Sequence, residues 1–275
     1  MAWTLTFTPY GGAESTIYVN GTTTDKTFQG EDGFGPPDHD AIIDPIPTQL
    51  ENVDRGVFWK ERVYVVTFRL LASSLSGLET LQNTWDSAHD AYAGVGVVKR
   101  VTAGGNTRYL NARPGKTTYG AREGFTKLVT QEYVAANPWW YAAVSSDSTA
   151  FNGATPVTKS LTNGGTIPTP PVWVITGVIE KPKIATANGS YGEINTTPAN
   201  NDDTLTLDLR PGNFAVLYRE HGAGAGTNWY PYRTSASDFG QNVWLPKGAN
   251  NVTLSATSGT AAVAVTWYNR YGGLS

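Results

Sequence analysis

The stretch from Asn163 to Gly177 constrains the fold of this chain more than any other part of the sequence. It reads Asn-Gly-Gly-Thr-Ile-Pro-Thr-Pro-Pro-Val-Trp-Val-Ile-Thr-Gly, which is a turn signal, then an extended proline segment, then a run of β-branched and aromatic residues. Pro170 and Pro171 have no N–H group to donate, so they cannot lie inside a sheet. The residues that follow them suit a strand in the core of a β-sandwich. The stretch therefore predicts the entrance to a second, β-structured domain.

The composition indicates a folded chain with many turns. Its 275 residues suffice for one large or two ordinary domains, and 40% of them are hydrophobic, which supports real cores. Only 16% are charged, against roughly 25% in ordinary soluble domains. Gly, Thr, Asn and Ser take their place. We interpret this as an all-β protein with many turns, or as one whose surface is largely covered by partners.

The composition also excludes several kinds of function. The net charge is −3, so no global basic field exists to hold nucleic acid. The chain has no cysteine, which rules out disulfides, thiol nucleophiles and Cys-ligated zinc. No apolar run approaches the roughly 20 residues that span a bilayer, and no signal peptide is visible. We expect synthesis in the cytoplasm and use without cleavage.

One helix and several strands are predicted in the first half. Val63–Leu70 is the best buried strand there. Leu75, Leu78, Leu81, Trp85, Ala88 and Tyr92 recur at spacings of three and four, which predicts a helix over about 76–93 with Trp85 buried. Ser76 with Glu79 fits a capping box, and Gly94 is a plausible stop. Residues 30–47 are rich in Gly and Pro, which predicts a long irregular loop that is functional or mobile.

The second half predicts strands throughout and no helix. Turn signals recur about every 8–12 residues, as a sandwich requires. Apolar and polar residues alternate at 205–209 and 263–267, so each of these strands places one face on a core. The predicted organisation is a β-rich α+β first domain over residues 1–145, a linker over 146–157, and an all-β, jelly-roll-like sandwich over 158–275.

No catalytic, cofactor-binding or metal-binding constellation emerges from the titratable residues. His39 has no second histidine at metal-ligand spacing, His89 is expected just off the buried stripe of the helix, and His221 precedes a flexible glycine run. Adjacent carboxylates such as Asp202 and Asp203 point apart, so they make poor acid–base partners. Calcium could bind near 200–203, but a solvated hairpin turn is the favoured interpretation.

Aromatic residues are the remaining candidates. The chain has nine Trp and fourteen Tyr, and three interpretations stay open for them: core packing, subunit interfaces, and platforms on which sugars stack. Trp229, Tyr230 and Tyr232 follow the glycine run 222–226, which makes them the best candidate for an exposed aromatic cluster. Trp139, Trp140 and Tyr141 close the first half and follow Asn137-Pro138, which is held extended. We expect them at an interface or a domain seam.

Four segments occur in a characteristic order along the chain. They are Asn137-Pro138-Trp139-Trp140-Tyr141, the run 163–171 (NGGTIPTPP), the turn 245–252 (LPKGANNV) and the closing strand 265–271 (VTWYNRY). In this order they resemble the distal tail proteins of long-tailed bacteriophages, a phage tail family often called Dit. Asn137 stands where the family usually has Asp. Each segment alone is weak, and the order and spacing carry the resemblance, which covers most of the chain.

The resemblance implies a structural virion protein. Family members form a six-subunit ring at the far end of the tail tube, in which the first domain resembles the tube subunit and the second, galectin-like domain projects outward. The implied partners are other copies of the chain, the tail tube protein, the baseplate hub or tail-associated protein, the tape measure protein, and receptor-binding or side-fibre proteins, with DNA passing through the lumen. The implied location is the virion tail tip, with a role in host attachment.

Two function classes are weighed against this one. The first alternative is a carbohydrate-binding module that recognises host-surface glycans, motivated by the sandwich and by Trp229, Tyr230 and Tyr232. Some family members carry inserted carbohydrate-binding modules, but no segment here is long enough for one, so direct sugar binding loses weight. An accessory domain of a glycoside hydrolase or esterase is the least favoured class. The resemblance thus implies a homohexameric baseplate protein, and the titratable residues suggest neither catalysis nor a cofactor.

Overall fold

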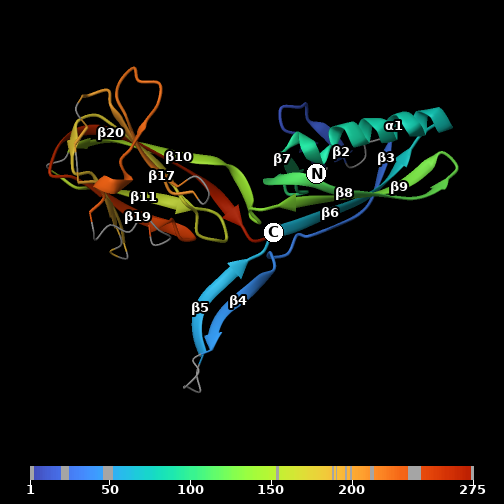
Figure 1. The fold of residues 1–275 in the computed structure, drawn as a ribbon, viewed down its shortest axis with the longest axis horizontal. Helices are drawn as coiled ribbons and strands as arrows, with labels where there is room; N and C mark the ends of the chain where they lie inside the picture. Colours follow the sequence, from blue (N-terminus) through green and yellow to red (C-terminus); the bar gives the residue numbers. More distant parts are fainter. Residues whose placement is uncertain are drawn as a thin grey trace. The chain divides into compact units, whose positions relative to one another are not determined.

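The chain divides into two compact units in a computed structural model. The structure describes residues 3–19, 25–45, 52–152, 155–187, 189, 191–195, 197–198, 200–210, 214–234 and 243–273. Unit 1 comprises Met1–Ala142 with Tyr271–Ser275, and unit 2 comprises Ala143–Arg270. The chain leaves unit 1 within strand β10 (Trp140–Asn152) and returns within β20 (Ser258–Tyr271). Both units are built mainly from antiparallel strands (Figure 1), which confirms the predicted fold class.

Unit 1 contains two layers of sheet. One has the strand order β10-β8-β7-β1-β2 and the other consists of β3, β6, β9 and β8, so the long strand β8 takes part in both. The strands are β1 (Thr4–Thr8), β2 (Ser15–Val19), β3 (Lys26–Asp32), β4 (His39–Pro45), β5 (Asn52–Trp59), β6 (Arg62–Leu71), β7 (Gly96–Val101), β8 (Thr107–Glu123) and β9 (Thr126–Ala135).

The core of unit 1 follows from the alternation along its strands. Every second residue of β6 is buried, and the antiparallel register sets Tyr64 opposite Tyr133 and Phe68 opposite Val129 of β9. Residues of β1, β7 and β8 join the same cluster. Because side chains alternate between the two faces of a strand, this pattern sends one complete face into the core. The predicted strand Val63–Leu70 is therefore confirmed as the centre of unit 1.

The only α-helix among the described residues, α1 (Leu75–Ala88), packs on this core, but its predicted ends need correction. Its cap is Ser74, whose side chain accepts the N–H of Gly77 at 3.1 Å, and not Ser76 with Glu79. The helix stops before the predicted 93, because the Asp90 side chain accepts the N–H of Tyr92 and starts a 3₁₀ turn, η1 (Ala91–Ala93). Trp85 is buried as predicted, whereas Tyr92 is exposed.

The segment 30–47 is more regular than expected. Its first residues belong to β3, and β4 pairs with β5 in a hairpin that forms a two-stranded sheet of its own (Figure 1). The prediction of a long irregular loop is therefore wrong for 39–45, while 46 and 47 lie outside the described residues. The glycines and prolines sit mainly in the turn that precedes β4.

Unit 2 is a two-sheet sandwich without an α-helix in its described residues. One sheet has the order β18-β17-β16-β12-β20-β10 and the other the order β11-β19-β14-β15. Its other strands are β11 (Val157–Asn163), β12 (Val172–Thr176), β13 (Ile179–Glu180), β14 (Lys183–Thr186), β15 (Tyr191–Glu193), β16 (Thr204–Asp208), β17 (Ala215–Arg219), β18 (Thr227–Asn228) and β19 (Gly248–Ser255); a short 3₁₀ turn, η2 (Tyr230–Tyr232), follows β18.

Both sheets of unit 2 supply its core. Leu205 and Leu207 of β16 and Val263 and Val265 of β20 are buried together with residues of β11, β14 and β19, so the alternation read from the sequence is confirmed. The segment 146–157, expected as a linker, is instead largely strand. β10 runs to Asn152, and Phe151 anchors it by packing into this core.

The proline-rich run is the entrance to the central strand of unit 2. Asn163 ends β11 with a buried side chain that accepts the N–H of Gly165 and donates to the carbonyls of Ile167 and Leu245, each at 2.9 Å. A Cβ on Gly165 would lie 2.3 Å from the carbonyl oxygen of Arg270, so only glycine fits there. The two prolines precede β12, which pairs with β16 on one side and β20 on the other.

Candidate functional site

Of the two histidines whose side chains the structure describes, His89 is structural and His221 lies on the surface. His89 is buried, which corrects its predicted place off the helix stripe. Its ring stacks on Trp85 at a centroid distance of 3.8 Å. Nδ1 lies 2.9 Å from the carbonyl oxygen of Trp85 and Nε2 lies 2.8 Å from the Tyr133 hydroxyl, so Nδ1–H donates and Nε2 accepts. Burial lowers the pKa of His89 to about 4. His221 is exposed, and His39 falls outside the residues whose side chains the structure describes.

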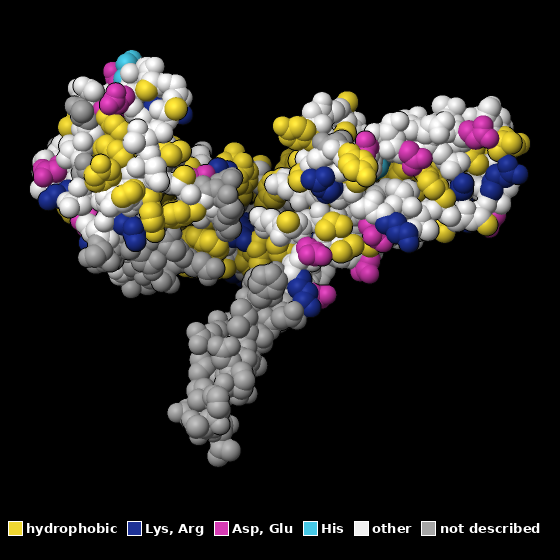
Figure 2. Space-filling model, in the orientation of Figure 1, with side chains coloured by type: hydrophobic (Ala, Val, Ile, Leu, Met, Phe, Trp, Pro, Cys, Tyr) yellow, Lys and Arg dark blue, Asp and Glu magenta, His cyan; other side chains and the backbone are white. Residues whose placement is uncertain are grey.

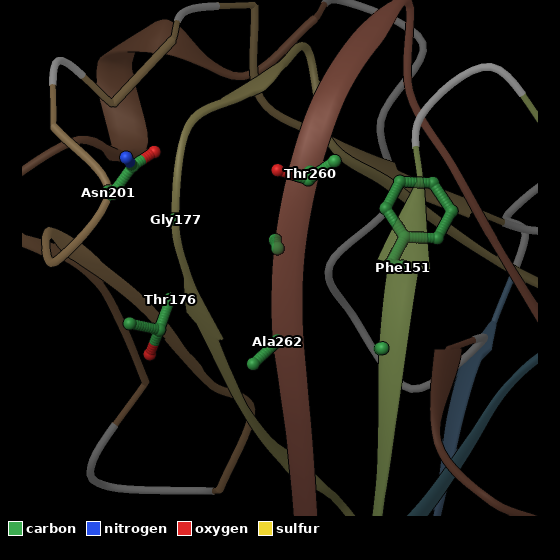
Figure 3. A pocket seen from close by; sticks show the side chains of 8 residues that line it. Phe151, Thr176, Gly177, Asn201, Thr260 and Ala262 are labelled. Carbon is green, nitrogen blue, oxygen red and sulfur yellow. The ribbon is translucent and has the colours of Figure 1, made fainter.

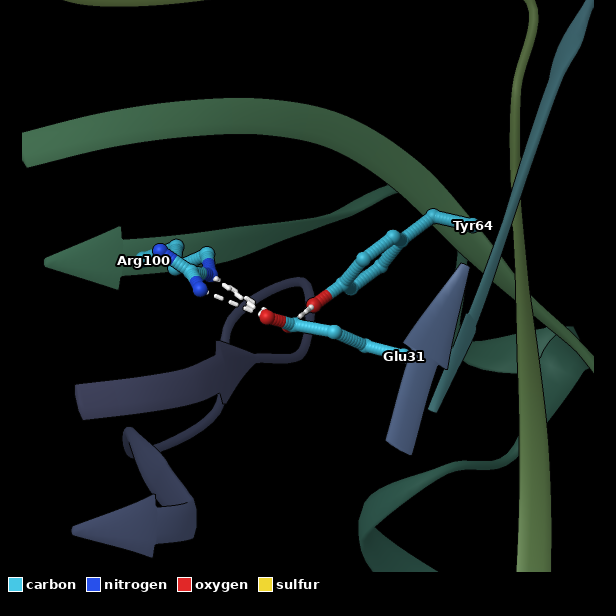
Figure 4. A network of polar contacts seen from close by, with 3 residues as sticks. All are labelled: Glu31, Tyr64 and Arg100. Carbon is cyan, nitrogen blue, oxygen red and sulfur yellow. Dashed lines mark hydrogen bonds and ion pairs between the residues drawn. The ribbon is translucent and has the colours of Figure 1, made fainter. Parts of the chain in front are cut away.

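Glu31, Arg100 and Tyr64 form a network of polar contacts in unit 1 (Figure 4). The carboxylate of Glu31 in β3 accepts from the Arg100 guanidinium of β7 at 2.5 and 3.1 Å and from the Tyr64 hydroxyl of β6 at 2.5 Å. The rings of Trp3 and Phe34 each lie 5.0 Å from the guanidinium carbon. Burial, together with the negative charge of Glu31, raises the pKa of Tyr64 well above its usual value. The charges of Glu31 and Arg100 are paired with each other. Together with the hydrogen bond from Tyr64, this pair connects β3, β6 and β7.

The buried cation Arg62 binds backbone carbonyls close to where the β4–β5 hairpin meets the sheet. Its guanidinium donates to the carbonyls of Gly33, Gly35 (2.8 Å), Pro138 (2.5 Å) and Gly272 (2.6 Å). The sequence prediction missed this residue. Its signal was present, because Arg62 continues the buried alternation of β6 by one more step. Desolvation lowers its pKa to about 10, which leaves it charged at neutral pH.

Asp203 is a buried structural carboxylate. It accepts from the Tyr218 hydroxyl at 2.5 Å and from the backbone N–H groups of Asn200 and His221 at 2.8 and 3.0 Å. These hydrogen bonds, that from Tyr218 above all, lower its pKa to about 2. Within the described part of the chain, no three His, Asp or Glu residues gather as a metal site would require. Asn200, Asn201 and Asp202 are exposed and only the Asp203 side chain is buried, so the turn expected at 200–203 is solvated except at Asp203.

A shallow hollow of about 570 Å³ lies on unit 2 beside the ends of β12 and β20 (Figure 3). Its lining consists of small or uncharged side chains: Ala150, Phe151, Thr176, Gly177, Asn201, Thr260, Ala261 and Ala262. No titratable group lines it, so it offers neither a nucleophile nor a general base. Charged side chains of both signs are interspersed on the face drawn in Figure 2, with no large patch of one sign. No helix among the described residues could cross a membrane.

The aromatic segment at 139–141 divides between core and surface. Trp140 is fully buried in the core of unit 1 and meets Tyr64 edge to face at 5.4 Å. Tyr141 stacks on Tyr109 at 5.6 Å and donates to Asn111 at 2.6 Å, and both Trp139 and Tyr141 stay partly exposed. The three residues therefore do not act together, and only Trp139 and Tyr141 can contribute to a surface.

The aromatic residues that follow the glycine run gather in unit 2. Trp229 stacks on Tyr218 at a centroid distance of 4.0 Å, and Tyr232 stands at 66° to Trp229 at 5.9 Å. Tyr230 meets Phe214 edge to face at 5.3 Å. Trp229 and Tyr230 are partly buried against the core of unit 2, and Tyr232 is 52% exposed. The cluster thus presents a rigid base and an exposed edge.

Comparison with known proteins shows which solved structures share this architecture. No protein-family model matches the chain, and no curated protein matches its sequence. Among solved structures, the chain matches the SPP1 Dit (gp 19.1) protein, described as a paradigm of the hub adsorption apparatus in phages that infect Gram-positive hosts. The two are 13% identical with a TM-score of 0.68, over 97% of this chain and 98% of that one. A chain of the phage P2 baseplate, in its activated conformation with Ca, also matches, at 10% identity and a TM-score of 0.48, over 96% of this chain and 98% of that one.

At this low identity the likeness to SPP1 Dit concerns the fold, and it extends over almost the whole of both chains. The resemblance drawn from the four sequence segments is therefore confirmed at the level of the fold: this chain has the fold of a phage distal tail protein.

Proposed function

We propose that the chain is a structural subunit of a phage tail tip, where six copies form a ring between the tail tube and the baseplate hub. The observation that carries this proposal is the end-to-end likeness to SPP1 Dit, a hub protein of an adsorption apparatus. Unit 1 would build the ring, and unit 2 would carry peripheral receptor-binding parts. Tail tube, hub and tape measure proteins would be the neighbours, and the location would be the virion.

The polar chemistry of the chain supports a scaffold without catalysis. The buried ionisable groups described above make structural contacts: Glu31 with Arg100, Asp203 with Tyr218, and His89 with Tyr133. A catalytic site needs a general acid, base or nucleophile that can reach a substrate. Groups that join strands to one another do not meet that need.

The β4–β5 hairpin supports assembly with other copies. It pairs with no other described strand, and an isolated two-stranded hairpin is marginally stable in water. Its root is held firmly, by Arg62 and by the hydrogen bond from the Lys60 N–H to the Asp38 carbonyl at 2.8 Å. A hairpin fixed at one end gains stability if a neighbouring subunit covers it. Hydrogen exchange should therefore slow in 39–45 and 52–59 when the ring forms, and unchanged exchange there would argue against this contact.

The partly exposed pair Trp139 and Tyr141 is assigned to the surface that other subunits cover. Aromatic side chains are enriched at interface cores. Replacement of both by Ser should weaken assembly while the core residue Trp140 keeps unit 1 folded.

The oligomeric state tests the proposal directly. Light scattering coupled to gel filtration should give a particle of six times the chain mass of 29.5 kDa, and electron microscopy should show rings. Antibody labelling of virions should mark the far end of the tail. A chain that stays monomeric at high concentration and is absent from the virion would overturn the assignment.

A further inference from the structure

The aromatic cluster of unit 2 has the construction of a binding platform. We call it the aromatic platform and define it by Phe214, Tyr218, Trp229, Tyr230 and Tyr232. Tyr218 forms its buried base, while Tyr232 and Phe214 are 52% and 44% exposed. Scattered single exposed aromatics are ordinary on protein surfaces. Here, however, the exposed rings of Tyr232 and Phe214 contact the less exposed rings of Trp229 and Tyr230, and Trp229 in turn stacks on Tyr218.

One buried carboxylate holds this platform in place. Asp203 accepts from the hydroxyl of Tyr218 and, through its second oxygen, from the N–H of His221 at the start of the glycine run. Tyr218 then supports one face of Trp229 in a near-parallel stack with an interplanar angle of 16°. The backbone N–H of Trp229 donates to the carbonyl of Val216 at 2.8 Å. Support of this kind keeps a recognition surface in one geometry before a ligand arrives.

The outer rings form a corner. Trp229 and Tyr232 meet at 66°, and the 3₁₀ turn η2 keeps them together through the hydrogen bond from the Tyr232 N–H to the Trp229 carbonyl at 2.9 Å. On the other side, the Arg233 guanidinium lies 4.2 Å from the centroid of Tyr230. The corner therefore combines apolar ring surface with the phenol hydroxyl of Tyr232, which can donate a hydrogen bond, while the guanidinium of Arg233 covers the neighbouring Tyr230 ring.

The surroundings favour a small neutral ligand. The exposed loop beside the platform, His221 to Asn228, carries no Asp, Glu, Lys or Arg and consists mainly of Gly and Ala. A nucleic acid would need several phosphate contacts, whereas the cation that the structure shows against a ring of the platform is Arg233, over Tyr230. A stable protein interface buries roughly 800 Å² on each partner, far more than two exposed aromatic side chains provide.

We propose that the aromatic platform binds a neutral oligosaccharide. A pyranose ring has an apolar face of C–H groups and a rim of hydroxyls. The C–H face would lie against Tyr232 in the corner with Trp229, and a hydroxyl of the sugar would receive a hydrogen bond from the Tyr232 phenol. This inference does not depend on ring formation, because all its residues come from unit 2 of a single chain.

Oligosaccharide binding by the full-length protein tests the inference. The probes are neutral oligosaccharides that end in glucose, galactose, rhamnose or N-acetylglucosamine, first on an array and then by calorimetry. We expect saturable binding by at least one series. Tyr232→Ala should weaken it roughly tenfold or more, and Tyr232→Phe, which keeps the ring, should weaken it much less. Tyr92→Ala removes a tyrosine that is 96% exposed in unit 1 and should leave binding unchanged.

Several results would overturn the inference. Failure to bind any neutral oligosaccharide is one, and equal binding by wild type and Tyr232→Ala is another. Specific capture of a protein by the platform, without sugar binding, would also reject it in favour of a protein contact. Tyr232 is largely exposed, so its loss should not unfold the chain, which a thermal melt will check. The particle mass of Tyr232→Ala separates the two proposals. A ring that does not bind sugar contradicts the platform alone, and a protein that binds sugar but forms no ring contradicts the proposed ring alone.

Discussion

At the scale of single residues, His89 couples the stability of unit 1 to pH. Its imidazole is buried between Phe7 and Trp85 and holds one tautomer through Trp85 and Tyr133. A second proton on Nε2 would break the hydrogen bond that this nitrogen accepts from the Tyr133 hydroxyl, and Tyr133 is fully buried. Lys26 adds a small repulsion. The folded protein therefore resists protonation that the unfolded chain accepts at an ordinary histidine pKa near 6.5.

We predict that the free energy of unfolding falls as pH drops from about 6.5 to about 4, because the unfolded state binds more protons in this window. Between pH 7 and pH 5 the loss should be roughly 2 kcal/mol, measured by urea denaturation. His89→Asn should remove this slope, while the exposed control His221→Asn should keep it. An equal slope in His89→Asn would assign the dependence to other groups. The Asp203 contribution disappears only at lower pH, between 3.8 and about 2.

At the scale of elements, the turn at 163–165 connects three parts of unit 2. The Asn163 side chain bridges the end of β11, the proline segment at Ile167 and the residue Leu245 before β19. Asn163→Ala leaves one N–H and two carbonyl groups without these partners, and should cost roughly 2–3 kcal/mol. Thr162→Ala, at an exposed neighbouring position, should cost little. Chemical denaturation compares the two, and equal costs would show that the bridge contributes no net stability.

Elements with a long, regular pattern were predictable from the sequence. Buried positions alternate with less buried ones along β6 and β12 and over most of β16 and β20, and α1 has an apolar stripe, so each appears where its periodicity placed it. The end of the helix was not predictable in this way. The apolar spacing continues to Tyr92, but the Asp90 side chain caps a separate 3₁₀ turn there. The end of β5 was predicted as a strand at 57–59, but β4 and its pairing with β5 were missed. The glycines and prolines before β4 indicated an irregular segment, and the short strand has little periodicity.

The candidate sites were predictable only in part. Trp229, Tyr230 and Tyr232 lie close together in sequence, so their cluster could be expected. The base formed by Tyr218 and Asp203 could not be expected from the sequence. Tyr218 is placed beside Trp229 by the pairing of β17 with β18, and Asp203 reaches Tyr218 through the fold of the 200–203 turn. In the same way, Arg62 contacts Gly272 from a position 210 residues away. Long-range contacts of this kind leave no local pattern.

At the scale of the whole molecule, each unit has a hydrophobic core of its own. The core of unit 1 includes Tyr271 from the end of the chain, and the core of unit 2 lies entirely within 151–267. The domain roles proposed above require that these cores support separate folding units. Two units with separate cores can unfold at different temperatures.

We therefore predict two calorimetric transitions, each sensitive to substitutions in one unit only. Gln131 is buried in unit 1, where its side chain accepts from the Trp85 indole N–H at 3.2 Å and the Thr117 hydroxyl at 2.6 Å. Gln131→Leu leaves both donors unpaired, so it should cost about 2 kcal/mol and lower one midpoint by roughly 6 °C. Asn163→Ala should lower the other midpoint and leave the first in place. If both variants shift one shared transition, the two units unfold as a single cooperative structure, and the assignment of separate roles to separately folded domains fails.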